Sequence, residues 1–134
     1  LMMVLFTDSP LRSVYSNSMK HYDENSWKRP FYQKGVDTSN FPLQGGFERG
    51  DLLLIRGTDP TEIKLGDVIV YRRGSDLIVH RVVEIRADNA NNLMFITKGD
   101  ANMWFDSPPV RSDQIVGKVL FVIPKLGWPS IWWR

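Results

Sequence analysis

The fold of this chain is decided by the run Ile78-Val79-His80-Arg81-Val82-Val83-Glu84-Ile85. Runs rich in β-branched residues are typical of strands, and side chains of a strand alternate between its two faces. We therefore expect the even-numbered residues on one face, namely Ile78, His80, Val82 and Glu84, and the odd-numbered residues on the other, namely Val79, Arg81, Val83 and Ile85. The pattern predicts a histidine among apolar neighbours within a sheet.

Other short apolar or β-branched runs lie on either side of this central run, separated by glycine-containing turns. They predict four further strands, over residues 52–55, 67–72, 93–97 and 115–123. Strong helical periodicity is absent, so the fold class is mainly β. A chain of 134 residues is long enough for one domain with one core and too short for two ordinary ones.

Composition excludes several classes of chemistry. The 17 basic and 15 acidic side chains leave a net charge of +2, and they are scattered, which argues against a nucleic-acid partner. The absence of cysteine excludes disulfides, thiol catalysis and thiolate metal sites. Only two histidines are present and no metal motif accompanies them, so we expect neither a metal nor a cofactor.

The segment 20–47 interrupts the strand pattern with aromatic and polar residues. It carries two prolines, ends on Gly45-Gly46, and includes the rings of Tyr22, Trp27, Phe31, Tyr32, Phe41 and Phe47. It is too aromatic for a flexible linker and is typical of an ordered loop packed by its own rings. A flap over a site beside Ser18 is one interpretation, and simple decoration of the surface is the other.

Both ends of the chain are apolar. The start, residues 1–6, is too short for a secretory signal, and no run reaches the roughly 18 to 20 apolar residues of a spanning helix. The end, residues 124–134, contains three tryptophans and a final arginine. Tryptophans of this kind suit a membrane surface and suit equally a segment that folds back over a sheet.

Two residues are the candidates for nucleophilic chemistry. Ser18 lies in a turn of small residues, and a hydroxyl nucleophile at neutral pH needs a neighbouring base. The histidines available are His21 and His80. If Ser18 and His80 meet in the fold, the chain is a serine hydrolase; an ordinary serine and a hydrogen-bonded core histidine are the alternative.

Two aspartates follow the strand over residues 93–97. Asp100 lies in a Gly-Asp turn at the end of this strand, and Asp106 comes six positions later. A catalytic histidine commonly needs a carboxylate that fixes its tautomer and stabilises its charged form. Because most Gly-Asp turns are structural, either aspartate alone is a weak indication.

Six short sequence boxes follow one another along the chain. They are Ser16-Asn17-Ser18-Met19, Arg49-Gly50-Asp51-Leu52-Leu53, Gly66-Asp67-Val68-Ile69-Val70, Val79-His80-Arg81-Val82, Thr97-Lys98-Gly99-Asp100 and Val116-Gly117-Lys118-Val119. In content and order they resemble the boxes of the type I signal peptidases. A histidine stands before Arg81 where the bacterial members carry a catalytic lysine. This resembles the branch found in archaea and in the signal peptidase complex of the endoplasmic reticulum. The resemblance covers residues 14–124, and the segment 20–47 departs from it as an insertion.

The resemblance implies a fold, a substrate and a location. It implies a single catalytic domain over residues 1–134, built as a mixed β-sheet or partly open barrel, with 20–47 as an irregular aromatic insertion and 124–134 near a membrane. The implied substrates are the signal peptides of preproteins, cut after small residues at the first and third positions and bound extended against a sheet edge. The implied location is the extracytoplasmic or lumenal side of a cell membrane, next to lipid. An anchoring helix is expected to be missing from this chain. The resemblance does not say whether accessory subunits are needed.

The resemblance also implies residue roles. Ser18 is the nucleophile and His80 the general base. One or both of Asp100 and Asp106 support His80, with Asp106 slightly preferred. The hydroxyl of Ser16 and the amide of Ser18 hold the oxyanion. With His80 as the base, His21 is interpreted as loop decoration.

Two other functions remain open from the sequence. A self-cleaving repressor-type serine protease shares the wider fold, although it normally uses a lysine base and carries a DNA-binding domain. A non-catalytic β module that binds peptides or a membrane surface would leave Ser18 and His80 with structural roles alone. Cleavage of a preprotein distinguishes these possibilities.

Overall fold

The computed structural model describes residues 11–13 and 16–124. The apolar start of the chain and the tryptophans of its end therefore lie outside the described residues, and the predictions made for them stay predictions. No helix within the described part of the chain has both the length and the apolar character needed to cross a membrane.

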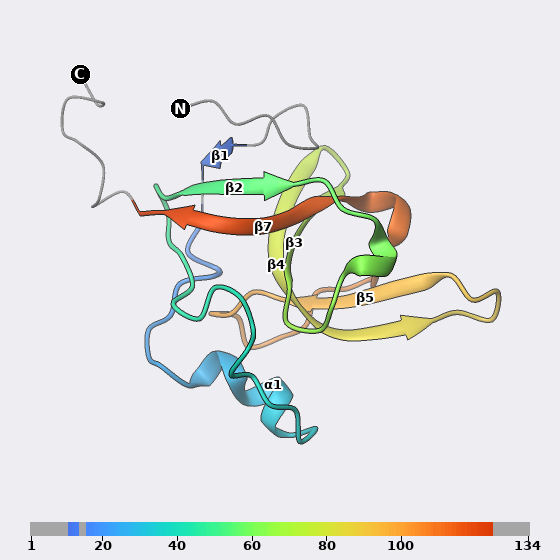
Figure 1. The fold of residues 1–134 in the computed structure, drawn as a ribbon, viewed down its shortest axis with the longest axis horizontal. Helices are drawn as coiled ribbons and strands as arrows, with labels where there is room; N and C mark the ends of the chain where they lie inside the picture. The colour runs from blue at the N-terminus through green and yellow to red at the C-terminus, as the bar shows by residue number, and fades with distance from the viewer. Residues whose placement is uncertain (1–10, 14–15, 125–134) are drawn as a thin grey trace.

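One seven-stranded sheet forms the body of the structure, in the order β1-β2-β7-β3-β4-β5-β6. The strands are β1 (Leu11–Ser13), β2 (Leu52–Arg56), β3 (Val68–Arg73), β4 (Asp76–Ala87), β5 (Leu93–Lys98), β6 (Val110–Arg111) and β7 (Ile115–Ile123). Figure 1 shows the long strand β4 curving from the part of the sheet next to β2 and β7 toward β5. The sheet is open, with β1 and β6 as its edges.

The predicted mainly β fold is confirmed, and the five predicted strands match β2, β3, β4, β5 and β7 to within two residues at each end. The short edge strands β1 and β6 were not predicted. The sheet is antiparallel in every described pairing rather than mixed. Short connections explain this, since two-residue and five-residue turns join β3 to β4 and β4 to β5, whereas parallel neighbours need long crossovers.

The predicted alternation along β4 holds as far as Val83, which packs with Trp27 on the face of Arg81. The pairing of β4 with β5 shifts its register between Val82 and Glu84, which is the mark of a β-bulge. Beyond the bulge the faces exchange, so that Ile85 packs on the cluster that contains Val82 while Val83 packs with Trp27. The prediction that Ile85 and Val83 share a face is therefore wrong, because one extra residue inverts the alternation.

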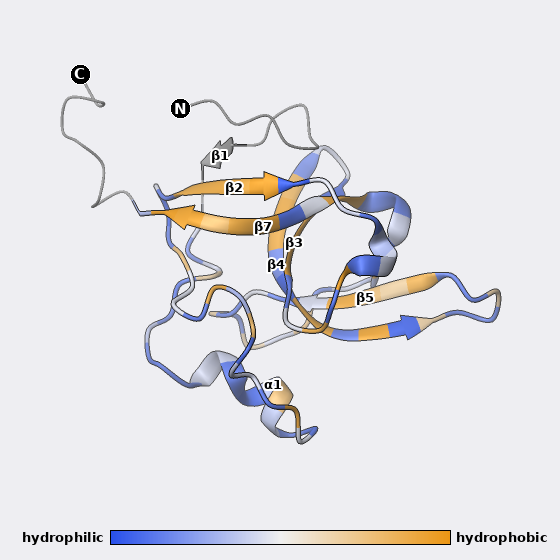
Figure 2. Ribbon diagram, viewed as in Figure 1, coloured by the Kyte–Doolittle hydropathy of each residue, from blue (hydrophilic) through white to orange (hydrophobic). Residues whose placement is uncertain are grey.

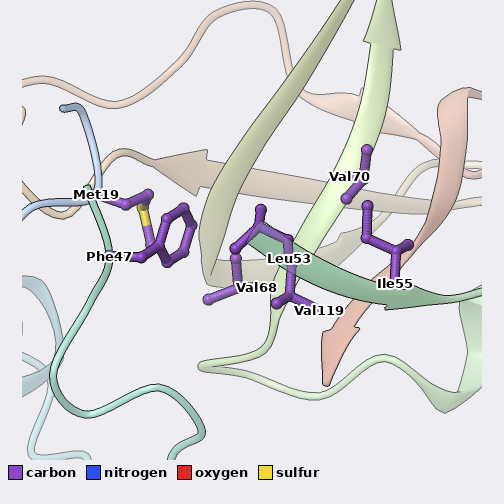
Figure 3. Close-up of a cluster of buried hydrophobic side chains, with 7 residues drawn as sticks. All are labelled: Met19, Phe47, Leu53, Ile55, Val68, Val70 and Val119. Atoms are coloured by element: carbon purple, nitrogen blue, oxygen red, sulfur yellow. The ribbon is translucent and has the colours of Figure 1, made fainter. Parts of the chain in front are cut away.

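Buried side chains anchor the segment around Ser18 to the sheet. Figure 3 shows Met19 and Phe47 at one end of a cluster that continues through strand residues Leu53, Ile55, Val68, Val70 and Val119. Met19 directly follows Ser18 and is 1 % exposed. Burial of a methionine side chain stabilises a fold by roughly 1.5–3 kcal/mol, so the apolar core fixes the position of the neighbouring serine.

The insertion 20–47 contains the short helical turns η1 (Ser26–Lys28) and α1 (Arg29–Tyr32). Trp27 and Phe31 are buried, and the rings of Phe31 and Phe41 meet edge to face with centroids 4.8 Å apart. These rings pack as the sequence suggests, whereas Tyr22 and Tyr32 are exposed. Figure 2 shows the hydrophobic residues concentrated in the strands, with the insertion more hydrophilic.

The remaining helical turns are η2 (Pro60–Glu62), between β2 and β3, and η3 (Ser112–Gln114), between β6 and β7. The side chain of Asp59 caps η2 by accepting a hydrogen bond from the Thr61 amide. Such caps satisfy amide groups that a helix start leaves without partners. Both turns lead into strands and bring them into the sheet.

Gly117 allows β2 and β7 to approach closely, and its replacement is predicted to destabilise the fold. A Cβ atom at this position would lie 2.3 Å from the carbonyl oxygen of Arg56, which is backbone and cannot move aside. We expect Gly117→Ala to lower the free energy of unfolding by about 1–3 kcal/mol, measured by urea denaturation. Gly45→Ala is the control, because a Cβ there meets nothing within 4 Å. Equal stability of the two variants would contradict the prediction.

Candidate active site

Ser18 lies in a tight turn that is held on several sides. The turn is closed by a hydrogen bond from the Lys20 amide to the Asn17 carbonyl, 3.0 Å long. The Asn17 side chain accepts a hydrogen bond from the Arg49 amide at 2.9 Å, and the Ala101 amide donates to the Ser18 carbonyl at 2.8 Å. The Ser18 hydroxyl is therefore presented from a fixed backbone.

His80 reaches Ser18 from the central strand β4. Its Nε2 atom lies 3.0 Å from the Ser18 hydroxyl oxygen. Its Nδ1 atom lies 2.5 Å from Oδ2 of Asp106. His80 pairs with the core residue Ile69 of β3 and is 8 % exposed, so its ring is set among apolar neighbours as the sequence predicts.

Asp106 is held in place by several hydrogen bonds. Its amide donates to the Thr97 carbonyl at 2.8 Å. Its Oδ2 atom accepts hydrogen bonds from the hydroxyls of Thr97, at 2.6 Å, and Tyr71, at 3.0 Å, besides the contact with His80. Burial alone would raise the pKa of Asp106, but these hydrogen bonds and the charge of His80 outweigh burial and lower the pKa below its ordinary value of 3.8. The carboxylate is therefore ionised at neutral pH.

Tyr71 supports this carboxylate as a hydrogen-bond donor. It is a residue of β3 with a fully buried side chain. Burial, with a smaller contribution from the charge of Asp106, raises the pKa of Tyr71 to about 12. The phenol therefore keeps its proton at any pH at which the protein would work, and it continues to donate to Asp106.

The arrangement can activate a hydroxyl group. An ionised Asp106 accepts the Nδ1 proton of His80, which leaves Nε2 as the acceptor that faces Ser18. A proton can then pass from the Ser18 hydroxyl to Nε2, and the carboxylate stabilises the imidazolium that forms. These are the groups and the order of contacts that nucleophilic catalysis by serine requires.

Ser16 lies beside the predicted nucleophile. Its hydroxyl oxygen is 3.1 Å from the Ser18 hydroxyl and 3.4 Å from the Ser18 amide nitrogen, which donates to it. The two predicted oxyanion donors therefore stand next to each other. In this structure they bond to each other, with a long and weak contact between the Ser18 amide and Ser16.

Asp100 is not a contact of His80. Its carboxylate accepts hydrogen bonds from Arg81, at 2.9–3.2 Å, and lies 2.7 Å from Nε2 of His21. Burial would raise the pKa of Asp100, but the bonds from His21 and Arg81 and their charges lower it below the ordinary value. Of the two predicted aspartates, the structure thus brings Asp106 to His80 and places Asp100 elsewhere.

His21 lies in the insertion loop as predicted, but its side chain is largely buried there rather than decorating the loop surface. Its side chain is 8 % exposed, bonds to Asp100, and stacks on Trp27 with ring centroids 5.2 Å apart. No local pattern indicates this contact, because His21 and Asp100 are 79 positions apart and meet only through the packing of the insertion.

Two contributors to the site were missed from the sequence, Thr97 and Tyr71. Both belong to recognised boxes or strands, but strand membership alone does not indicate that two hydroxyls converge on one carboxylate. Strand alternation could have indicated Tyr71. This residue pairs with Ile78 on β4, which is two residues from His80, so the side chains of Tyr71 and His80 lie on the same face of the sheet.

Two lysines that could be considered as bases, Lys20 and Lys98, are bonded to other groups in the described structure. The Lys20 ammonium pairs with Glu48 at 3.2 Å. The Lys98 ammonium donates to the carbonyls of Gly99, at 2.9 Å, and Asn102, at 2.8 Å. Among residues 11–13 and 16–124, no group of three or more acidic or histidine side chains could hold a metal ion.

Comparison with known proteins reveals relatives that are catalytic subunits of signal peptidase complexes. The chain is 33 % identical over 100 residues to the signal peptidase complex catalytic subunit SEC11 of Zygosaccharomyces rouxii, covering 67 % of this chain and 59 % of the relative. It is 34 % identical over 101 residues to that of Pyrenophora tritici-repentis, covering 66 % and 57 %. For the subunit of Saccharomyces cerevisiae the identity is 34 % over 100 residues, covering 67 % and 59 %.

The chain thus spans less than two thirds of the length of the curated relatives it matches. No family model matches it, and no solved structure matches it.

The ionisation of Asp106 is predicted to depend on Thr97. Thr97→Val removes one hydrogen bond from the carboxylate, so we expect the pKa of Asp106 to rise, as followed by carbon-detected NMR titration of aspartate carboxyls. The pKa of Asp106 is lower in the folded chain than in the unfolded chain, so its ionised form stabilises the fold at neutral pH. This stabilisation is lost as the pH falls through the folded-state pKa. The variant, in which the pKa is less lowered, should therefore be less stable than the wild type at neutral pH. Thr58→Val, remote from the site, is the control. An unchanged Asp106 titration would refute the prediction.

Proposed function

Since this chain is a homologue of the type I signal peptidases, in the branch of the archaea and the endoplasmic reticulum, we propose that it is a serine endopeptidase that removes N-terminal signal peptides from preproteins. One observation carries the proposal: the contacts from Ser18 through His80 to Asp106. We assign Ser18 as nucleophile, His80 as general base and Asp106 as the carboxylate that orients it.

The reaction follows from these contacts in two halves. His80 takes the proton of the Ser18 hydroxyl through Nε2 while the oxygen attacks the scissile carbonyl carbon. His80 then gives this proton to the leaving amine, the C–N bond breaks, and an acyl-enzyme forms on Ser18. Water loses a proton to His80 as its oxygen attacks the ester carbon. The bond to the Ser18 oxygen then breaks, His80 returns the proton to that oxygen, and the signal peptide leaves with a free carboxylate. Asp106 keeps the imidazole in the required tautomer throughout.

We assign the oxyanion to the Ser18 amide and the Ser16 hydroxyl. The tetrahedral intermediate carries a negative oxygen that two nearby donors stabilise. In the structure the amide donates to the Ser16 oxygen over 3.4 Å, which is a weak contact that a bound carbonyl can replace. The Ser16 hydroxyl can then turn its proton toward the same oxygen, because a hydroxyl rotates freely about its C–O bond.

The substrate, partners and location form part of the proposal. We propose an extended signal-peptide end with small residues at the first and third positions before the cut. The relatives are named as catalytic subunits of a complex, so we propose that this chain also acts with accessory subunits. The proposed setting is a membrane surface, on its extracytoplasmic or lumenal side, where secreted and membrane preproteins emerge.

Removal of either reacting group is predicted to abolish cleavage. Ser18→Ala deletes the nucleophile and His80→Ala deletes the base, so each should lower kcat by about a thousandfold or more. The assay is cleavage of a preprotein by the purified chain reconstituted with detergent or lipid, with kcat and KM measured separately. Ser75→Ala, at the exposed turn between β3 and β4, is the control.

The outcomes separate the candidate functions. Loss of cleavage in both variants, with an active Ser75→Ala control, supports the peptidase. Retained cleavage in both variants would exclude Ser18 and His80 from catalysis. A wild-type chain that binds signal peptides without cutting them would instead favour a peptide-binding module.

The pH dependence distinguishes a histidine base from a lysine base. A histidine must be neutral to accept the serine proton, so kcat/KM should rise with pH through about 6 to 7, where histidine side chains ordinarily titrate. The profile is recorded with a short peptide substrate so that binding to lipid does not contribute. A rise confined to the alkaline range of lysine would contradict the assignment of His80.

A further inference from the structure

A second histidine–aspartate pair lies behind the reactive one. Nε2 of His21 is 2.7 Å from Oδ2 of Asp100, and the two side chains are 8 % and 2 % exposed. Within the described structure, neither side chain forms a hydrogen bond with Ser18 or His80. His21 comes from the insertion 20–47, which is absent from the family pattern of boxes. Asp100 comes from the turn over residues 98–102, which follows β5.

The turn 98–102 also holds the nucleophile. The Ala101 amide donates to the Ser18 carbonyl at 2.8 Å, and the Asp100 amide lies 3.3 Å from the sulfur of Met19. Gly99 permits this approach, since a Cβ atom there would lie 2.8 Å from the Ser18 carbonyl oxygen. The position of the Ser18 backbone therefore depends on the position of turn 98–102.

The last residues of the insertion, Gly46 and Phe47, lie next to the residues that follow Ser18. The Phe47 amide donates to the Met19 carbonyl at 3.1 Å, and Lys20 forms a β-bridge with Gly46. A Cβ atom on Gly46 would lie 2.6 Å from the imidazole of His21, so the chain closes tightly around this ring. The insertion thus encloses His21 next to the residues that follow Ser18.

Two cationic side chains near Asp100, besides His21, have hydrogen-bond partners in the described structure. Arg81 of β4 is fully buried; it bonds to Asp100, and its guanidinium also donates to the carbonyls of Pro42, Leu43 and Gly66. The ammonium of Lys98 donates to carbonyls of its own turn. His21 is therefore the contact that links Asp100 to the chain three residues beyond Ser18.

We propose that His21 is a positioning residue for Ser18: by bonding to Asp100, it fixes the insertion to turn 98–102 and so keeps the Ser18 hydroxyl within reach of His80. This inference rests on the proposed peptidase function. Asp100 then helps to position the nucleophile. The insertion contributes to catalysis through His21, without touching the reacting atoms. Small displacements of a nucleophile reduce the rate of attack far more than the binding of substrate.

The test compares three variants of the chain. His21→Ala removes the contact, His21→Gln keeps an amide donor that can reach Asp100, and Tyr32→Ala is the matched control, an exposed aromatic residue of the same insertion. For each variant we would measure kcat and KM on a signal-peptide substrate and the rate at which a fluorophosphonate labels Ser18. Hydrogen–deuterium exchange of residues 16–20 and 98–102 reports the mobility of both turns.

The expected result is a loss of rate without a loss of binding. His21→Ala should lower kcat and the labelling rate by about tenfold to a hundredfold, with KM within about twofold, and should speed exchange in both turns. His21→Gln should recover most of the rate, and Tyr32→Ala should match the wild type. If His21→Ala loses stability while kcat and exchange in both turns stay unchanged, the role of His21 is structural alone and the proposal fails.

Failure of the proposed function gives a different result. In that case the wild-type chain neither cleaves the substrate nor reacts with the fluorophosphonate. Exchange still tests the positioning: faster exchange at residues 16–20 in His21→Ala, reversed in His21→Gln, supports it, and equal exchange in all variants overturns it.

Discussion

The burial of one guanidinium is the constraint on which the rest of the structure depends. Arg81 is 0 % exposed, and a charge in that position needs a counter-charge and a partner for each donor. Asp100 supplies the charge, and three backbone carbonyls take up further donors. The Trp27 ring covers the group, 4.4 Å from its centre. Loss of one partner from a buried ion pair typically costs about 3–5 kcal/mol, so sheet, insertion and turn 98–102 are stable only together.

Two adjacent residues of β4 belong to different parts of the structure, His80 to the candidate active site and Arg81 to the contacts that hold the insertion. His80 and Arg81 point to opposite faces because strand side chains alternate. On one face His80 meets Ser18 and the carboxylate of Asp106. On the other, Arg81 meets Asp100 and the insertion. Each face has its own histidine and aspartate, and the β-bulge after Val82 leaves this division intact because it lies beyond both residues.

Runs of apolar and β-branched residues were sufficient for the five longer strands, whereas the edge strands β1 and β6 are too short to show such a run. For Ser18 and His80, residue type left structural roles open, and the resemblance to the ordered family boxes indicated the pair. Local pattern could not show which of Asp100 and Asp106 contacts His80, since both follow the same strand. The path of the chain after β5 directs the Asp106 carboxylate to His80 and the Asp100 carboxylate to Arg81. Local pattern also could not find the bulge, or the role of His21, because these depend on register and on contacts between distant segments.

The hydrogen bond between Ser18 and His80 joins residues 62 positions apart, and Asp106 comes a further 26 positions later. Contacts of such separation form slowly, because a long loop must close before they can stabilise the chain. During synthesis the serine therefore emerges well before the groups that would activate it. In a partly made chain the Ser18 hydroxyl has neither His80 nor Asp106 near it, and the proposed activation requires β3, β4 and β5 to have assembled. The contact between Ser18 and His80 therefore forms only when this part of the sheet is complete.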